Sequence, residues 1–198
     1  MIQPAILYEH GAKLLFFQKG DQIFKEGQLA LCYFQIVSGE VKMNNFNDDG
    51  KEFIQGIFLS GQSFGEPPLF ADVTYPANAE ALTDAEILRI DKQAFIKLLE
   101  LHPQQHLGVT TALASRLYYK AIMASELSSQ EPEHRILRIL DYLKTYVHKL
   151  EQPYTFEVDL TRQQIADLTG LRVETVIRAT KSLEKKGELK IRNRKIYR

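Results

Sequence analysis

The chain has little of what several protein classes require. It contains one cysteine, Cys32, and no tryptophan. A single thiol excludes an intrachain disulfide and an iron–sulfur cluster held by several thiolates of this chain. The longest unbroken apolar run is the six residues 29–34, which is far too short to cross a bilayer. The first residues also lack the pattern of a signal peptide, so we expect a cytoplasmic protein that does not enter a membrane.

Residue patterns that carry catalysis or hold metals are scarce as well. The sequence has no nucleophile–base pair and no glycine-rich loop of the phosphate-cradling kind. His102 and His106 are four residues apart, but no third metal ligand accompanies them. We therefore expect neither an enzyme nor a metal site.

Positive charge is concentrated at one end of the chain. The net charge is zero, but residues 1–159 carry −7 and residues 160–198 carry +7. A solvated basic face would give the same count, so charge alone does not decide between the two interpretations. The alternative is a surface that binds the phosphates of a nucleic acid.

Residues 1–90 consist of short β-rich runs separated by glycines. Asp49-Gly50 lies between two such runs and predicts a hairpin, because glycine tolerates the positive φ of these turns. Many short strands at close spacing predict an antiparallel sandwich or barrel-like roll. Helical patterns follow, over Lys92–Leu101 and from about Gln104 to Ser129.

The longer helix carries a narrow stripe at alternating spacings of three and four residues, formed by Leu107, Thr110, Ala114, Leu117, Ala121, Ala124 and Ser128. This pattern is typical of a coiled-coil seam and predicts a homodimer, although a plain packed helix has a similar pattern. Leu113, Ile122 and Leu127 lie off the stripe, and we expect them to pack on the β-domain.

The helical pattern breaks at residues 128–131, where we place a domain boundary. Pro132 suits the first turn of a new helix. Its apolar face is predicted to comprise Ile136, Ile139, Leu140, Leu143, Val147 and Leu150. The following segment, EQPYTFEVDL, reads as a loop and a short strand.

The basic segment has the pattern of a helix-turn-helix. Thr161 and Gln164 form a capping box, and Gly170 can adopt the left-handed conformation that ends the helix. A second helix is predicted from Arg172 to about Lys185, with Val176, Ala179 and Leu183 inward and Arg172, Glu174, Arg178 and Lys181 outward. A plain αα-corner is the alternative, but it has no special need for positive charge. The final LKIRNRKIYR predicts a β-hairpin wing whose cations can touch a DNA backbone.

Two residues of the second helix suit the reading of bases. Glu174 and Arg178 are four apart and share a face, so we expect them to hold each other in position. Arg178 can donate two bonds to a guanine edge, and Glu174 can accept from a cytosine or adenine amino group. A surface ion pair of no functional consequence would show the same spacing.

Residues 160–189, LTRQQIADLTGLRVETVIRATKSLEKKGEL, resemble the helix-turn-helix of the cyclic-AMP receptor protein/FNR superfamily of regulators. FQKGDQIFKEGQ, FQIVSGEVKM, DGKEFIQGIF and FGEPPLF resemble its cyclic-nucleotide-binding β-roll. The resemblance implies an α+β fold with a β-roll sensor domain (1–103), a dimerisation helix and hinge (104–130) and a winged helix-turn-helix (131–198). It also implies double-stranded DNA and RNA polymerase as partners.

The resemblance further implies roles for single residues. Arg162 and Thr175 would hold phosphates, and Glu174 and Arg178 would read bases. Val173 before Glu174 is more similar to the FNR branch than to the cyclic-AMP receptor. Arg172 departs from the family because a capping Ser or Thr is usual there, and it is expected to reach DNA instead, as is Lys181.

The cyclic-nucleotide site is degenerate by the same comparison. Gly65 and Glu66 are present, but Tyr75-Pro76 stands where cyclic-AMP binders have Arg-Ser, so the cyclic phosphate lacks its charged partner. That loss costs roughly several kcal/mol. We expect no useful binding of cyclic AMP, no cofactor, and a pocket that holds an unrelated small molecule or nothing. Its residues are Gly65, Glu66, Tyr75, Pro76, Ala77, Arg116 and Lys120.

The leading hypothesis is a homodimeric regulator that binds a palindromic DNA site. The alternative is a small-molecule or protein-binding sensor module whose helix-turn-helix no longer reads DNA. Arg162, Glu174, Arg178 and the +7 segment argue against that alternative.

Overall fold

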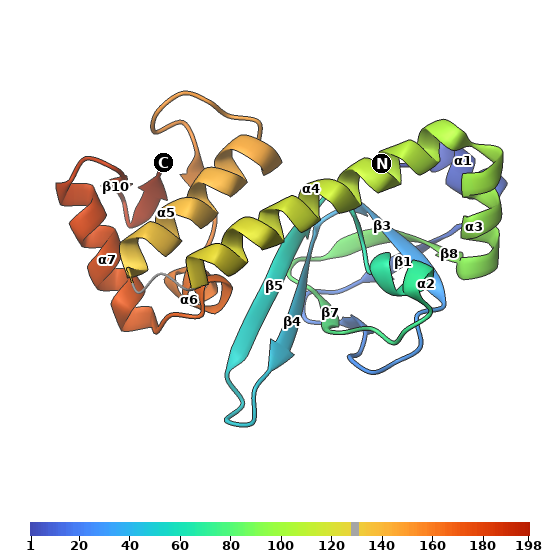
Figure 1. The fold of residues 1–198 in the computed structure, drawn as a ribbon, viewed down its shortest axis with the longest axis horizontal. Helices are drawn as coiled ribbons and strands as arrows, with labels where there is room; N and C mark the ends of the chain where they lie inside the picture. The colour runs from blue at the N-terminus through green and yellow to red at the C-terminus, as the bar shows by residue number, and fades with distance from the viewer. Residues whose placement is uncertain (128–130) are drawn as a thin grey trace. The chain divides into compact units, whose positions relative to one another are not determined.

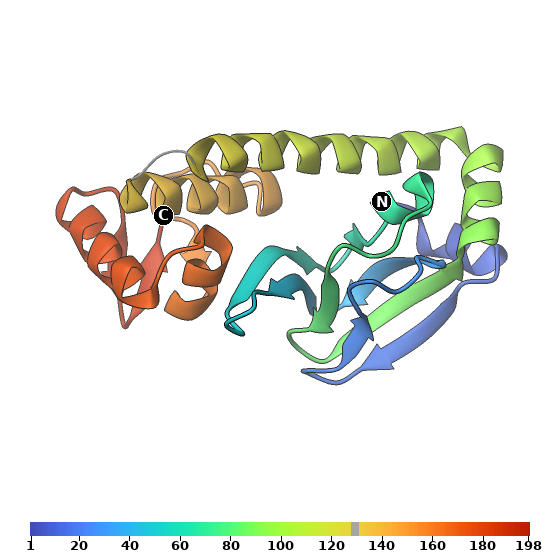
Figure 2. The ribbon, with the colours of Figure 1, turned by 60° about the horizontal axis from the view of Figure 1, so that its bottom comes forward.

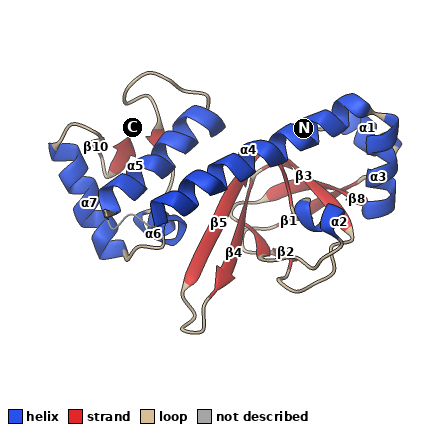
Figure 3. Cartoon of the chain, viewed as in Figure 1, coloured by secondary structure: helices blue, strands red, loops and turns tan. Residues whose placement is uncertain are grey.

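The computed structural model describes the backbone of residues 1–127 and 131–198. The chain divides into two compact units, Met1–Ser115 and Arg116–Arg198, each with its own apolar core. Strands dominate the first unit and helices the second (Figure 3). The predicted α+β class is confirmed, whereas the three-part division at residues 103 and 130 stays a prediction.

The first unit is a roll of antiparallel strands that begins with the helix α1 (Pro4–Glu9) (Figure 1). One sheet has the order β1 (Lys13–Phe17), β8 (Ala85–Asp91), β3 (Cys32–Ser38) and β6 (Ser63–Phe64). The other has the order β2 (Gln22–Phe24), β7 (Asn78–Ala81), β4 (Glu40–Phe46) and β5 (Glu52–Leu59). β4 and β5 form the predicted hairpin around Asp49-Gly50, with Phe46 opposite Glu52 and Gly50 at a φ of +74°.

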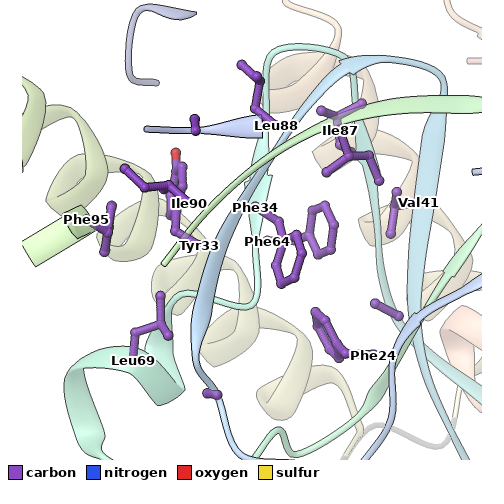
Figure 4. Close-up of a cluster of buried hydrophobic side chains, with 14 of the residues drawn as sticks. Phe24, Tyr33, Phe34, Val41, Phe64, Leu69, Ile87, Leu88, Ile90 and Phe95 are labelled. Carbon is purple, nitrogen blue, oxygen red and sulfur yellow. The ribbon is translucent and has the colours of Figure 1, made fainter. Parts of the chain in front are cut away.

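Aromatic side chains from both sheets fill the roll (Figure 4). The rings of Phe34 and Phe64 stack with 5.4 Å between centroids, and Phe24 contacts both. α2 (Pro67–Ala71) and α3 (Lys92–Leu101) border this core. Tyr33 of β3 stacks on Phe95 of α3 with 4.3 Å between ring centroids. This contact fixes α3, the helix that precedes the long helix, to the sheet.

α4 (Pro103–Leu127) is one continuous helix that leaves α3 at a sharp turn (Figure 2). Leu113 packs on the core of the roll, as predicted. The stripe residues Leu107, Thr110, Ala114, Leu117, Ala121 and Ala124 are all exposed in the single chain. Ser128, Ser129 and the side chains of Ile122 and Leu127 lie outside the described residues.

The second unit contains α5 (Pro132–Tyr142), α6 (Arg162–Thr169), α7 (Val173–Lys185) and a small sheet of the order β10 (Lys190–Arg192), β11 (Lys195–Tyr197) and β9 (Glu157–Val158). Ile136, Ile139 and Leu140 are buried, as predicted. The short strand predicted within EQPYTFEVDL is β9.

Beyond Tyr142, the predicted apolar face is confirmed at Leu143 and Leu150, which pack on the core of the second unit, but not at Val147. Residues Leu143–Val147 form a π-helical turn, closed by the bond from the His148 N–H to the Leu143 carbonyl at 2.9 Å. The wider turn shifts later side chains around the axis. As a result Lys144 is buried and Val147 is only half-buried.

No helix in the described part of the chain has the length and apolar character needed to span a bilayer. Within residues 1–127 and 131–198, the His, Cys, Asp and Glu side chains form no cluster of three that could hold a metal ion.

Candidate nucleic-acid interface

The start of α6 is fixed by local hydrogen bonds. The Gln164 N–H donates to the Thr161 hydroxyl at 3.1 Å, and the Thr161 N–H donates to the Gln164 side chain at 2.8 Å. This is the predicted capping box, and it satisfies two N–H groups that a helix start leaves without partners.

A tight turn joins α6 to α7. Gly170 has a φ of +68°, the left-handed conformation predicted for it, and the Leu171 N–H donates to the Ala166 carbonyl at 3.0 Å. The Arg135 guanidinium of α5 donates to the Thr169 carbonyl at 3.1 Å. α5 therefore supports the turn that sets the direction of α7.

α7 has the two faces that its sequence predicts. Val176, Ala179 and Leu183 are buried against the core of the second unit. On the other face, Arg172, Glu174, Arg178 and Lys181 are exposed. Thr175 is half-buried, and Val173 is half-buried and packs on the core. Arg172 is the N-cap residue, and its side chain makes no capping bond. The helix therefore presents a mixed charged surface at its first turns.

The expected ion pair between Glu174 and Arg178 is wrong for the free chain. Among the described residues, neither side chain makes an ion pair or a hydrogen bond. The physical reason is that an exposed pair in water gains little, because two long side chains must be held in one geometry. Both groups are therefore available to an external partner.

Arg162 at the start of α6 is partly used within the protein. It is half-buried, which lowers the pKa of its guanidinium, and it donates to the Arg194 carbonyl at 3.3 Å. It thus connects the helix-turn-helix to the tip of the β10–β11 hairpin, the predicted wing. Its predicted phosphate contact stays a prediction.

Ion pairs that the sequence did not reveal attach the wing to the helices. Arg198 makes a two-bond contact with Asp141 of α5, at 2.6 and 3.2 Å, and pairs with Glu188 at 2.9 Å. Glu157 of β9 accepts from Lys195 and from the Tyr197 hydroxyl, and these bonds lower the pKa of its carboxyl. The partners are far apart in sequence, so no local pattern indicates them.

In the roll, aromatic rings cover Gly65, the glycine of the predicted effector pocket. Gly65 has a φ of +74°, and a Cβ there would lie 3.1 Å from the Phe24 ring and 3.3 Å from the Tyr75 ring. Tyr75 is 3% exposed and stacks on Phe24 with 3.7 Å between ring centroids. The two rings therefore occupy the space beside Gly65.

The remaining groups of this site are also engaged. Glu66 is 1% exposed and accepts a hydrogen bond from the Ser63 hydroxyl. The Tyr75 hydroxyl donates to the Cys32 carbonyl at 3.2 Å, and burial raises the pKa of Tyr75 to about 12.

The other predicted pocket residues lie in different surroundings. Ala77 is buried in the core of the roll, and Pro76 is exposed. Arg116 and Lys120 belong to the second unit, where desolvation and the Arg116 charge lower the pKa of Lys120. Their assignment to the pocket stays a prediction.

Comparison with known proteins gives matches to two family models. The family described as "Cyclic nucleotide-binding domain" matches residues 14–102, and the one described as "Crp-like helix-turn-helix domain" matches residues 134–197. The chain is 29% identical over 159 residues to the cAMP-activated global transcriptional regulator CRP of Haemophilus influenzae, covering 80% of this chain and 71% of that protein. It is 26% identical over 180 residues to Electron transport regulator A of Shewanella oneidensis, covering 90% and 72%.

Solved structures share the fold. The c-di-GMP responsive global regulator CLP of Xanthomonas campestris is similar with a TM-score of 0.77 at 24% identity, over 98% of each chain. FixK2 from Bradyrhizobium japonicum has a TM-score of 0.78 at 23% identity, over 94% of this chain and 91% of that one. A roll, a long helix and a winged helix-turn-helix thus recur together in these structures.

Proposed function

The chain belongs to the CRP/FNR superfamily of DNA-binding transcription regulators, and from that premise we propose that it acts as a homodimer on a palindromic site without control by cyclic AMP. The families are transcription regulators and not enzymes. We propose RNA polymerase as its protein partner on the basis of family membership.

The exposed face of α7 carries this proposal. Arg172, Glu174, Arg178 and Lys181 make no ion pair within residues 1–127 and 131–198. A helix of this kind enters the major groove with its first turns against the base edges. Arg178 suits a guanine, and Glu174 suits the amino group of a neighbouring base.

The stripe on α4 supports the homodimer. Leu107 is 60% exposed and Leu117 is 70% exposed in the single chain, next to the small residues Ala114 and Ala121. An uncovered apolar stripe of coiled-coil spacing fits a second copy of the same helix. A two-fold dimer requires half-sites ~34 Å apart, about one turn of DNA.

The aromatic contents of the roll support independence from cyclic AMP. A nucleotide beside Gly65 would have to displace the rings of Tyr75 and Phe24, and the chain offers Tyr75-Pro76 in place of a cationic partner. Relatives of this chain include regulators described as cAMP-activated and one described as c-di-GMP responsive, so effectors differ among them.

Calorimetric titration tests this part of the proposal. It should detect no micromolar binding of cyclic AMP, and tight binding would contradict the proposed independence from that nucleotide.

Selection from a random-sequence duplex pool tests DNA reading. We expect enrichment of an inverted repeat. Arg178→Ala should weaken binding by about 1–3 kcal/mol for each half-site of the selected repeat and relax the preference at one base position of each half-site. Lys13→Ala, which removes an exposed cation of β1, is the control and should leave both unchanged.

The same selection experiment distinguishes the proposed regulator from the alternative function. Binding of DNA without any enriched repeat, or an unchanged preference in Arg178→Ala, would favour a sensor module whose helix-turn-helix no longer reads sequence.

A further inference from the structure

Three tyrosine rings stack where the end of α4 contacts α5. The ring of Tyr119 in α4 lies on the ring of Tyr142, the last residue of α5, with 3.6 Å between centroids and 20° between planes. The ring of Tyr146 stacks on Tyr142 with 5.7 Å between centroids and 22° between planes. Tyr146 belongs to the π-helical turn, a rare geometry that often occurs at functional sites. We call these three residues the tyrosine stack.

The tyrosine stack lies beside the apolar core of the second unit and is not part of it. That core joins α5, α6, α7 and the small sheet, and it includes Ile136 of α5 and Val176 of α7. Tyr146 is 52% exposed. Tyr119 is half-buried, and burial raises the pKa of its hydroxyl. The stack therefore connects α4 to α5 without filling the core on which the DNA-binding helices pack.

The same part of α4 carries half of the apolar stripe. Leu117, Ala121 and Ala124 belong to the stripe, are exposed and lie in the second compact unit. Tyr119 follows Leu117 by two residues, which corresponds to about 200° around an α-helix. The stack and the stripe therefore lie on opposite sides of α4. One side of this segment is open to a second copy of the chain, and the other side is fixed to α5.

We propose that Tyr119 and Tyr142 are specificity-determining residues that restrict the protein to one spacing between the two half-sites. α5 shares a core with α7, so a ring contact that fixes α5 to α4 also fixes α7 relative to the stripe. This inference rests on the proposed function and adds the residues that set the spacing. Both tyrosines act as positioning residues, because they influence DNA only through α5 and α7.

The geometry of DNA makes the spacing sensitive to this contact. One base pair inserted between the half-sites moves them apart by about 3.4 Å and rotates them by about 35°. A dimer that holds its recognition helices rigidly cannot follow this displacement, so it loses part of the advantage of two linked contacts. A dimer in which α5 moves freely on α4 can follow it.

Duplexes with different spacers test the role of the stack. The half-sites of the selected repeat are joined by the selected spacer, or by that spacer with one base pair added or removed, and fluorescence anisotropy gives each Kd. Either changed spacer should weaken binding of the unmodified protein by about 10- to 100-fold. In Tyr119→Ala this spacing ratio should fall below about 3-fold, because α7 is no longer held at one distance from the stripe. The affinity for a duplex with a single half-site should be unchanged.

Three further variants control the experiment. Tyr142→Ala removes the other ring of the contact and should give the same low ratio as Tyr119→Ala. Tyr119→Phe keeps the stacked ring and should keep the spacing ratio of the unmodified protein. Tyr8→Ala removes a tyrosine that is 50% exposed in the first unit, and it should also keep the ratio. Sedimentation equilibrium measures whether each variant is a dimer.

The results separate this inference from the proposed function. If the unmodified protein selects no inverted repeat, the proposed function fails. If it selects one, an unchanged spacing ratio in Tyr119→Ala and Tyr142→Ala, or equal binding of all three spacers by the unmodified protein, overturns the inference alone. Loss of the dimer or of single half-site binding in both variants overturns it as well, because the stack then supports the fold and does not set the spacing.

Discussion

At the scale of single residues, the ring of Tyr75 fills space beside Gly65 in the roll. Its stacking on Phe24 at 3.7 Å makes it part of the core. Tyr75→Ala should lower the free energy of unfolding by about 3–5 kcal/mol, because it leaves a cavity. Tyr75→Phe keeps the ring and loses only the bond to the Cys32 carbonyl, which is worth about 1 kcal/mol. Denaturant unfolding of both variants measures the difference, and equal losses would show that the ring does not fill the site.

The same residue predicts a pH dependence at alkaline pH. The pKa of Tyr75 is about 12 in the folded chain and 10 for a free tyrosine. Because the folded pKa is the higher one, its contribution to stability is complete below pH 10 and is lost as the pH rises towards 12. The free energy of unfolding should therefore fall more steeply over this interval in the unmodified protein than in Tyr75→Phe. Identical pH profiles would contradict the burial of the hydroxyl.

Whether the sequence reveals the surroundings of a residue depends on how far along the chain its contact partners lie. The exposure of Arg172, Glu174, Arg178 and Lys181 could be predicted, because helical spacing fixes which side chains share a face. The contact of Tyr75 with Phe24 could not, since 51 positions separate them and no local pattern connects them. The ion pair of Glu174 with Arg178 was wrong, because spacing permits a contact but does not supply the energy to form it.

At the scale of elements, the two helices of the DNA-binding motif differ in how they begin. α6 has a capping box, whereas α7 begins at Arg172 without a side-chain cap. Arg172→Ser should raise the free energy of unfolding by about 1 kcal/mol by capping α7, and it should weaken DNA binding if Arg172 reaches the duplex. Thermal unfolding and gel-shift titration measure the two effects.

Thr161→Ala is the reciprocal control for helix capping. It removes the acceptor for the Gln164 N–H and should lower the free energy of unfolding by about 1 kcal/mol. A loss of stability in Arg172→Ser would show that the arginine stabilises the start of α7 by another contact.

Elements defined by neighbouring residues could be predicted, and elements defined by distant partners could not. The capping box and Gly170 are local signals, and α6 begins and ends where they place it. By contrast, the pairing of β9 with β11 joins residues about 40 positions apart. The π-helical turn at Leu143–Val147 has no signal in an apolar spacing that continues through it.

At the scale of the whole molecule, the long helix belongs to both compact units. The units divide between Ser115 and Arg116, inside α4. Tyr119 of α4 stacks on Tyr142 of α5 with 3.6 Å between ring centroids, so the end of α4 packs with the DNA-binding helices. Periodicity indicates which face of a helix is apolar but not what covers it. The boundary at residues 128–131 that the sequence indicates therefore stays a prediction.

The stripe of α4 that is exposed in the single chain predicts how the whole molecule assembles. Leu117 is 70% exposed and belongs to that stripe, whereas Leu101 at the end of α3 is 60% exposed and does not. Leu117→Glu should convert a dimer into a folded monomer, because it places like charges opposite each other in the seam. Leu101→Glu, an equal change at a similar exposure, should leave the dimer intact.

Sedimentation equilibrium measures the mass of both variants, and circular dichroism verifies that they are folded. A monomer can place only one α7 in the major groove, so Leu117→Glu should also lose most of its affinity for the inverted repeat while keeping weak binding to a single half-site. A monomeric unmodified protein, or a Leu117→Glu variant that remains a dimer, would show that this stripe is not the interface and that the palindromic site needs another explanation.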